Sequence, residues 1–293
     1  MKTSNTSEAG LETLIVNSLT GITATPRAES EANTELGYAA HQYGRPVYVL
    51  GRNQDYDRDH AVDLAKLQNF VFKTQPQSAE KLALFQEGPS RTQFLHRLQG
   101  EIAKRGVIDV LRNGVKHGPV HLDLFFGTPS PGNLKARERF VANIFSLTPQ
   151  LRYSKDEAKL ALDLCLFING LPVVTFELKN RLTKQTDQDA VQQYKRDRDP
   201  KELLFQFGRC MVHFAVDDQE VWMCTHLKGK DSWFLPFDKG HNDGAGNPPN
   251  SGGLKTAYLW EEILTKSGLT DIIENYGNST RRDNRYTAYT RGC

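Results

Sequence analysis

Two apolar stretches joined by Asn-Gly constrain the fold of this 293-residue chain more than any other feature. Residues 160–168 and residues 171–178 have the length and apolar character of buried strands. Asn169-Gly170 lies between them, and this dipeptide between two apolar runs is the strongest short-range signal for a β-hairpin. The sequence therefore predicts an antiparallel hairpin over residues 160–178.

Three charged residues interrupt this hairpin. Glu177 and Lys179 are two apart on one strand, so their side chains point to the same face. Asp163 lies near the start of the other strand. It faces Glu177 only if the loop has three residues or the hairpin contains a bulge, because a regular two-residue loop would pair Asp163 with Phe176. A single site formed by the three residues therefore requires an irregular hairpin.

Charges on apolar strands need a partner, because burying an unpaired charge costs several kcal/mol. Two facing carboxylates repel each other unless a cation lies between them, and Mg²⁺ binds carboxylate oxygens while keeping several waters. Such an ion polarises a phosphate and lowers the pKa of a bound water. A nearby lysine can hold or deprotonate the attacking water, or stabilise the charge that develops. We predict Asp163 and Glu177 as Mg²⁺ ligands and Lys179 as a catalytic residue. The alternative is a salt-bridged strand edge in which Lys179 neutralises Glu177.

The remaining segments predict an α/β fold with a mixed β-sheet flanked by helices, since helices and strands alternate on either side of the hairpin. Periodicity and turn signals place the other elements. Helices are expected at residues 11–19, 56–73, 92–105, 135–144, 186–196, 258–264 and 269–275, and strands at residues 47–50, 107–111, 120–126, 210–216 and 221–225.

Composition excludes several classes of protein. Charged residues are 25% and hydrophobic residues 38% of the chain, which is typical of a globular protein. The formal net charge of +2 does not by itself indicate a nucleic-acid partner. No signal peptide or long apolar run is present, and the four cysteines lack metal-binding spacing. We expect a cytoplasmic protein that does not associate with a membrane.

The hairpin and its surroundings resemble a known family. Asp163 followed by Glu177-Leu178-Lys179 resembles the D…(D/E)xK signature of the PD-(D/E)xK nucleases. A series of blocks covering most of the chain is similar to the N-terminal nuclease region of the R subunit of type I restriction enzymes. These blocks are LRNGVK (111–116), LDL (162–164), FINGLP (167–172), FELKN (176–180), QYKRDRDP (193–200), VHFAVD (212–217), FLPFDKG (234–240), GAGNPP (244–249) and YLWEEIL (258–264).

This resemblance implies a restriction-endonuclease-like core that cleaves double-stranded DNA with Mg²⁺, in an assembly with methylation and specificity subunits. It implies the same roles for the hairpin residues as those given above. It also matches Gln193 to a catalytic glutamine on the helix after the hairpin, and Glu12 to an accessory acid on the first helix. The related pattern often has a tyrosine four residues after that glutamine, where this chain has Asp197. The role of this helix is therefore left open.

R subunits of this family also carry an ATP-driven motor, which needs a phosphate loop ending in Gly-Lys-Ser/Thr. This sequence has no such loop, because Gly229-Lys230 is followed by Asp231. We expect ATP to bind only motor domains outside this chain. Three regions are predicted: an N-terminal helical and β region (1–145) packed on the core, a nuclease core with its following loop and helices (146–276), and a flexible tail or truncated boundary (277–293).

A run of alternating charges follows the hairpin. Its basic residues are Lys184, Lys195, Arg196, Arg198 and Lys201, interleaved with four aspartates. Alone, this run is typical of a solvated helix face. Its position after the charged strand also makes it a candidate for contacts with DNA phosphates. The predicted DNA-binding residues are Arg181, Lys184, Lys195 and Arg196.

Two other functions remain as alternatives. A stand-alone nuclease of the same fold is disfavoured by the blocks after Lys179 that resemble type I R subunits. A non-cutting docking module that links motor and partner subunits is disfavoured by the three charges on the hairpin. Binding of a divalent metal would separate the docking module from a nuclease.

Overall fold

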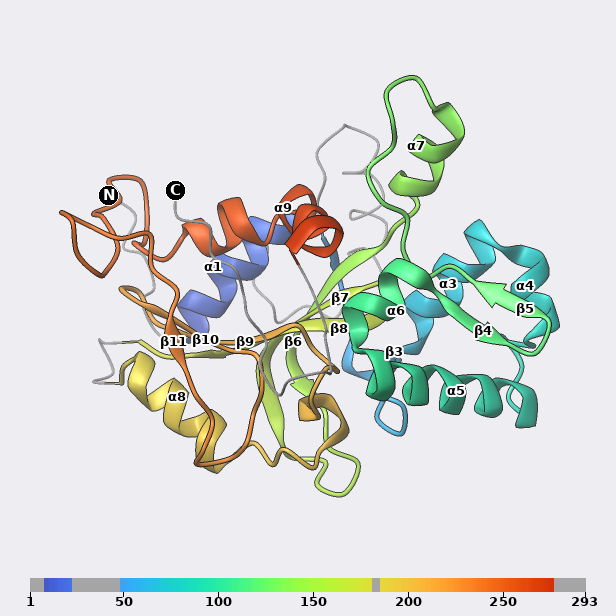
Figure 1. Cartoon of the computed structure of the whole chain (residues 1–293). Helices are drawn as coiled ribbons and strands as arrows, with labels where there is room; N and C mark the ends of the chain where they lie inside the picture. Colours follow the sequence, from blue (N-terminus) through green and yellow to red (C-terminus); the bar gives the residue numbers. More distant parts are fainter. Residues whose placement is uncertain (1–7, 23–47, 181–184, 277–293) are drawn as a thin grey trace.

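A seven-stranded mixed sheet forms the centre of the computed structural model, which describes residues 8–22, 48–180 and 185–276 (Figure 1). The strand order is β1-β6-β7-β8-β9-β10-β11. Helices lie on both faces, so the predicted α/β fold with a flanked mixed sheet is confirmed. The strands are β1 (Val49–Leu50), β6 (Phe145–Arg152), β7 (Ala161–Ile168), β8 (Leu171–Leu178), β9 (Val212–Val216), β10 (Val221–Cys224) and β11 (Leu235–Pro236).

The mixed character of the sheet arises at two pairs of strands. β6, β7 and β8 are antiparallel neighbours, as are β9, β10 and β11, whereas β8 pairs with β9 in parallel. β1 also runs parallel to β6. A parallel connection needs a crossover, and here the crossover contains α8 (Asp187–Arg196). This helix starts at a capping box formed by Thr186 and Asp189.

The predicted hairpin is β7-β8, and its turn is fixed inside the molecule. Asn169 and Gly170 have φ values of 50° and 85°, as the two central residues of a type I′ turn require. A Cβ at Gly170 would lie 2.4 Å from the backbone oxygen of Asp63. The Asn169 side chain accepts a hydrogen bond from Ile144 N at 2.7 Å and donates to Leu124 O at 2.8 Å. Close packing therefore requires glycine at position 170, and the two hydrogen bonds explain asparagine at position 169.

Each face of the sheet is covered by its own apolar core. On one face, β7 and β8 pack against α1 (Glu8–Thr20), α9 (Lys266–Asp271) and the π-helical turns Leu259–Ile263 and Ile272–Tyr276. α8 covers the opposite face (Figure 1). Its core includes Phe167, Val191, Tyr194 and Phe205. The hairpin is therefore enclosed between two helical layers.

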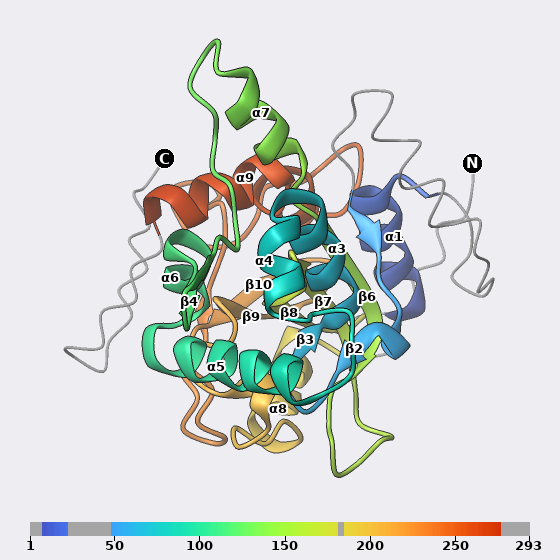
Figure 2. The same cartoon turned by 90° about the vertical axis from the view of Figure 1, so that its right-hand side faces the viewer.

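A helical lobe, defined here as residues 64–122, continues the first core beyond one end of the sheet (Figures 1 and 2). α7 (Leu134–Val141) projects from the rest of the fold and has no buried residue. The elements of the lobe are α3 (Leu64–Thr74), α4 (Pro76–Lys81), α5 (Pro89–Arg105), α6 (Val107–Asn113), β4 (Val115–His117) and β5 (Val120–Leu122).

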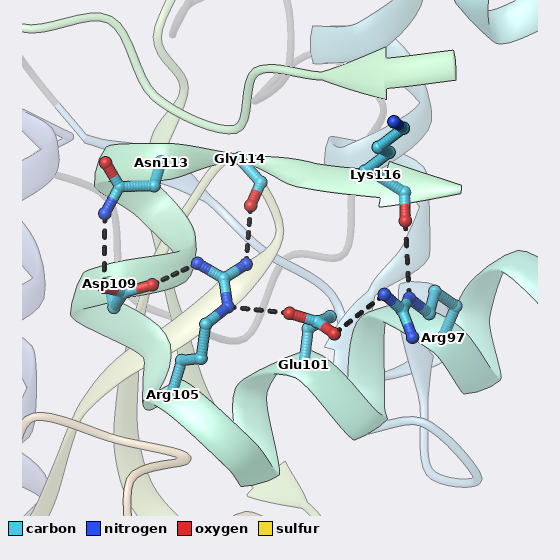
Figure 3. A network of polar contacts seen from close by, with 7 residues as sticks. All are labelled: Arg97, Glu101, Arg105, Asp109, Asn113, Gly114 and Lys116. Atoms are coloured by element: carbon cyan, nitrogen blue, oxygen red, sulfur yellow. Dashed lines mark hydrogen bonds and ion pairs between the residues drawn. The ribbon is translucent and has the colours of Figure 1, made fainter. Parts of the chain in front are cut away.

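An ion-pair network fastens α5 to α6 and β4 in this lobe (Figure 3). Arg97 and Arg105 both bind Glu101, at 3.0 and 2.7 Å. Arg105 also pairs with Asp109 and donates to Gly114 O at 2.8 Å. We call these four charged residues the lobe network. A spacing of four residues brings Arg97, Glu101 and Arg105 to one side of α5, and Asp109 joins them from α6.

The helix predicted over residues 56–73 is wrong in its first half. The chain there forms β2 (Tyr56–Asp57) and β3 (Val62–Asp63), and the helix begins only at Leu64. Asp63 caps the helix by accepting a hydrogen bond from Lys66 N at 3.0 Å. Its own N–H donates to Gly170 O on the β7-β8 turn. The helical pattern of apolar residues continues before Leu64, but the helix does not. The contact of Asp63 with Gly170 fixes the backbone there, and this contact is not visible in the local sequence.

The strand predicted at residues 107–111 is also wrong, because these residues belong to α6. A short apolar run fits a buried strand and a buried helix equally well. Val107, Ile108, Val110 and Leu111 are all buried in the first core. Enclosure on several sides of a helix explains why apolar residues stand on both sides of Asp109.

The strand β6 was not predicted. It contains Pro149, which argues against a central strand. β1 pairs only with Ser146 and Leu147, so no described strand pairs with β6 on that side at Pro149. The missing N–H therefore breaks no pairing with β1.

Other expectations concern the ends and loops. The predicted tail over residues 277–293 lies outside the described residues. None of the described helices combines the length and hydropathy needed to span a membrane. Cys165, Cys210 and Cys224 are buried free thiols.

Candidate active site

The β7-β8 hairpin brings Asp163 and Glu177 opposite each other. Leu164 pairs with Phe176, and the register shifts between Leu166 and Phe167. Continuing the register by one residue beyond Leu164–Phe176 pairs Asp163 with Glu177. The hairpin thus combines a two-residue turn with a bulge, and the predicted irregularity is confirmed.

The two strands cease to pair as a regular ladder at this point. The pairs end at Leu164–Phe176. Asp163 Oδ2 instead accepts a hydrogen bond from Leu178 N at 2.7 Å. A side-chain carboxylate therefore binds the backbone N–H between Glu177 and Lys179, which holds Asp163 against both residues.

Glu177 is completely buried. Its Oε1 accepts a hydrogen bond from Arg198 Nε at 2.6 Å, whereas its Oε2 is buried without a hydrogen-bond partner among the described residues. Burial raises the pKa of Glu177 to about 8, outweighing the attraction of Arg198. Asp163 raises this pKa further and Lys179 lowers it. The carboxyl group therefore lies where more positive charge would stabilise its ionised form.

Lys179 follows β8 and is half-buried. Its backbone N–H donates to Val216 O at 2.9 Å, which extends the parallel contact between β8 and β9. The Lys179 charge is among those that lower the pKa of Glu177. Asp163, Glu177 and Lys179 therefore form one electrostatic group, while their catalytic and metal-binding roles remain predictions.

α1 contributes a further carboxylate. Burial raises the pKa of Glu12, and a hydrogen bond from Gln150 opposes that shift. The charge of Asp163 also raises the Glu12 pKa. Glu12, the predicted accessory acid, thus lies within electrostatic reach of Asp163, and the role itself is still a prediction.

Gln150 is a site residue that sequence reasoning missed. It has a left-handed φ of 48° and lies between the pairs Pro149–Leu164 and Leu151–Leu162, opposite Asp163. A non-glycine residue in this conformation is uncommon and is often found at functional sites. Pro149 is the one sequence signal for this irregularity, since proline inside a strand is typical of bulges.

α8 is fastened to the sheet through Tyr194 rather than through Gln193. The Tyr194 hydroxyl lies 2.8 Å from Thr175 Oγ1, which lies 2.7 Å from His213 Nδ1. Burial lowers the pKa of His213 to about 3, so this histidine is a neutral core residue. Gln193 is half-buried, and no hydrogen bond joins its side chain to Glu177 or another described residue. Its catalytic role stays a prediction.

The charged run after the hairpin is divided between the interior and the surface. Arg198 is buried against Glu177, so its assignment to a solvated or phosphate-binding face is wrong. Arg196 is exposed and Lys195 half-exposed at the end of α8, as phosphate contacts require. The predicted DNA-binding residues Arg181 and Lys184 lie outside the described residues.

The donor set fits Mg²⁺ better than a metal that needs a full protein shell. Within residues 8–22, 48–180 and 185–276, no three His, Cys, Asp or Glu side chains converge as a metal site. Mg²⁺ usually takes one or two carboxylates and keeps several waters. Asp163 and Glu177 offer two carboxylates, and Glu177 Oε2, which no described residue contacts by a hydrogen bond, is an oxygen that a cation would stabilise.

Comparisons with known proteins agree with this geometry. The chain is 23% identical over 245 residues to the Methanocaldococcus jannaschii protein named "Putative type I restriction enzyme MjaVIIIP endonuclease subunit". The match covers 75% of this chain and 22% of that relative, so the chain spans about a fifth of its length. The model of the type I restriction enzyme R protein N terminus matches residues 35–232, which is more than half of the chain. The chain therefore belongs to the family of the type I restriction enzyme R protein N terminus.

Proposed function

We propose that this chain is the Mg²⁺-dependent endonuclease domain of a type I restriction enzyme R subunit, which hydrolyses phosphodiester bonds of double-stranded DNA. The observation that carries this proposal is the bulged hairpin, which aligns Asp163 with the buried Glu177, whose Oε2 has no hydrogen-bond partner among the described residues. Membership of the R-subunit family supports it, as does the relative whose name describes an endonuclease subunit.

Each residue of the hairpin has a separate task in this proposal. Asp163 and Glu177 would hold the ion, which supplies Lewis-acid polarisation of the phosphate and activation of water. Lys179 would orient the attacking water and stabilise the negative charge that develops on the phosphate. Glu12 would act as an accessory acid and Gln193 as a polar contact from α8.

DNA affinity would come from local charge and from partners. Arg196 and Lys195 lie at the end of α8, where they can contact phosphates once DNA is bound. The net charge of +2 indicates weak affinity for DNA in isolation. We propose that methylation and specificity subunits supply sequence selection, and that an ATP-driven motor elsewhere in the R subunit delivers the DNA.

The test is metal binding followed by DNA cleavage. Mn²⁺ or Mg²⁺ binding is measured by calorimetry for the wild type and for Asp163→Asn, since asparagine can still accept the hydrogen bond from Leu178 N. Asp123→Asn is the matched control, because Asp123 is a half-exposed carboxylate that directly follows β5. Supercoiled plasmid is then incubated with each protein and the same metal.

The proposal predicts that the wild type and Asp123→Asn bind the ion and nick plasmid, and that Asp163→Asn does neither. Metal binding by Asp163→Asn equal to that of the wild type would remove Asp163 from the ligand set. A folded wild type that neither binds the ion nor cuts with DNA present would favour the docking module.

A further inference from the structure

One guanidinium group contacts three separate elements at the candidate active site. Arg198 Nε donates to Glu177 Oε1 at 2.6 Å, on β8. Its Nη1 donates to the Tyr153 hydroxyl at 3.2 Å, just after β6, and its Nη2 donates to Ala161 O at 2.8 Å, at the start of β7. Arg198 is only 5% exposed. The three hydrogen bonds therefore replace those that its guanidinium group would make with water.

The contacts of Arg198 span the place where β7 and β8 stop pairing. Ala161 lies two residues before Asp163, and Glu177 lies one residue beyond the last pair, Leu164–Phe176. The β7-β8 ladder has therefore ended before Asp163 and Glu177, and its backbone hydrogen bonds do not fix the distance between these two carboxylates. Arg198 joins both strands at this end of the hairpin.

Resting on the proposed function, we propose that Arg198 is a positioning residue that binds Glu177 Oε1 and thereby presents Oε2 to the catalytic ion. Arg198 does not take the place of the ion, because it binds Oε1 and no described residue forms a hydrogen bond with Oε2. Its other contacts also hold it independently of Glu177: it binds Ala161 O and Tyr153, and its guanidinium carbon lies 5.6 Å from the centre of the Tyr153 ring. It can therefore stay in position when the ion binds.

The planar guanidinium is essential to this role. Arginine presents several N–H groups in a rigid fork, whereas the lysine ammonium is a point charge on a flexible stem. A lysine at position 198 would keep the positive charge but could not donate along the same three directions. The substitution Arg198→Lys therefore separates the effect of the positive charge from the effect of the guanidinium geometry.

The experiment measures Mn²⁺ binding to the full 293-residue chain by calorimetry and by the electron paramagnetic resonance signal of free Mn²⁺. The variants are Arg198→Gln, Arg198→Lys and Tyr153→Phe. Arg137→Gln is the charge-matched control, because Arg137 is exposed on the projecting helix α7. Thermal unfolding is recorded beside each titration, so that only folded protein is compared.

We expect Arg198→Gln to weaken Mn²⁺ binding about 10- to 100-fold, the range found when a partner of a metal ligand is removed. Arg198→Lys should fall between Arg198→Gln and the wild type, and Tyr153→Phe should show the smallest loss. The Mg²⁺ concentration for half-maximal plasmid cleavage should rise in the same order, and Arg137→Gln should match the wild type.

Two results overturn the proposal in distinguishable ways. If the wild type binds Mn²⁺ and Arg198→Gln or Arg198→Lys binds it equally or more tightly, Arg198 has only a structural role or competes with the ion, while the proposed function stands. If the folded wild type binds no Mn²⁺ with or without DNA, the positioning role and the proposed function fail together. If Arg198→Gln does not fold, Arg198→Lys and Tyr153→Phe decide, since both retain most of the contacts.

Discussion

The charged residues at the hairpin and those of the lobe network differ in their exposure to water. Glu177 and Arg198 are 0% and 5% exposed at their side chains, whereas exposure in the lobe network ranges from 13% at Glu101 to 52% at Arg97. Water can solvate the lobe network if one member is lost. At the hairpin, the loss of one member leaves the other buried charge without a partner.

This difference shows which network can bind a catalytic ion. Every carboxylate of the lobe network is engaged by arginine or asparagine, as Figure 3 shows. At the hairpin, Glu177 Oε2 accepts no hydrogen bond from a described residue, and Asp163 raises the Glu177 pKa. Partial satisfaction of a buried charge network costs stability, and such sites are found where function requires them.

The largest expected difference between the two networks is in catalysis. Lys179→Met should lower the rate of plasmid cleavage about 100- to 1000-fold, the loss typical when one group that stabilises the transition state is removed. Mn²⁺ binding should be retained, because Lys179 is not a ligand in the proposed site. Arg105→Met in the lobe network should cut as the wild type does. Equal rates for Lys179→Met and Arg105→Met would contradict the assignment of Lys179.

The second prediction compares stability. Glu177→Leu should lower the free energy of unfolding by about 3–5 kcal/mol, because Arg198 remains charged and buried without its carboxylate. Glu101→Leu, in the lobe network, should cost at most about 1 kcal/mol, since Arg97 and Arg105 can turn to water. Urea unfolding at pH 9, above the Glu177 pKa of about 8, measures both losses. Similar losses would show that burial does not separate the two networks.

The third prediction concerns pH. The pKa of Glu177 is about 8 in the folded chain, above its ordinary value of 4.5. Its protonated form is therefore favoured by folding, and its contribution to stability is complete below pH 4.5 and is lost as pH rises through 8. Burial also raises the pKa of Asp63, to about 6, with the same sign. The contribution of Glu177 is therefore isolated only by the difference in the free energy of unfolding between the wild type and Glu177→Gln.

That difference is measured by urea unfolding at pH 5, 6.5 and 8. The free energy of unfolding of the wild type should fall more steeply with pH than that of Glu177→Gln over this interval. Parallel curves would show that Glu177 is already ionised in the folded chain at pH 5, held so by Arg198.

The smallest expected effect is that of salt. At 1 M ionic strength the Debye length is about 3 Å, which screens exposed charges strongly and buried pairs much less. The stability difference between wild type and Arg97→Gln should therefore shrink when NaCl is raised from 0.05 to 1 M. The difference between wild type and Arg198→Gln should stay nearly constant. Equal salt dependence of the two differences would indicate that water reaches the Arg198–Glu177 pair.

The candidate site was predictable where its signals were local. Asp163, Glu177 and Lys179 belong to one hairpin, so strand periodicity and the Asn169-Gly170 turn place them together. The bulge that aligns Asp163 with Glu177 was required by the same reasoning and is present in β7-β8. Arg198 was misassigned because its charged neighbours suggested a solvated run, whereas its burial depends on Glu177 and Ala161.

The sequence by itself determined the hairpin, the helix that crosses from β8 to β9 and the α/β class, since these follow from short-range periodicity and turn chemistry. The tertiary structure alone decided that α6 is a helix, that Gln150 is opposite Asp163 and that Gln150 binds Glu12, 138 residues earlier. The physical reason is that burial and ion pairing depend on neighbours brought together by the fold, which a pattern within one segment does not contain.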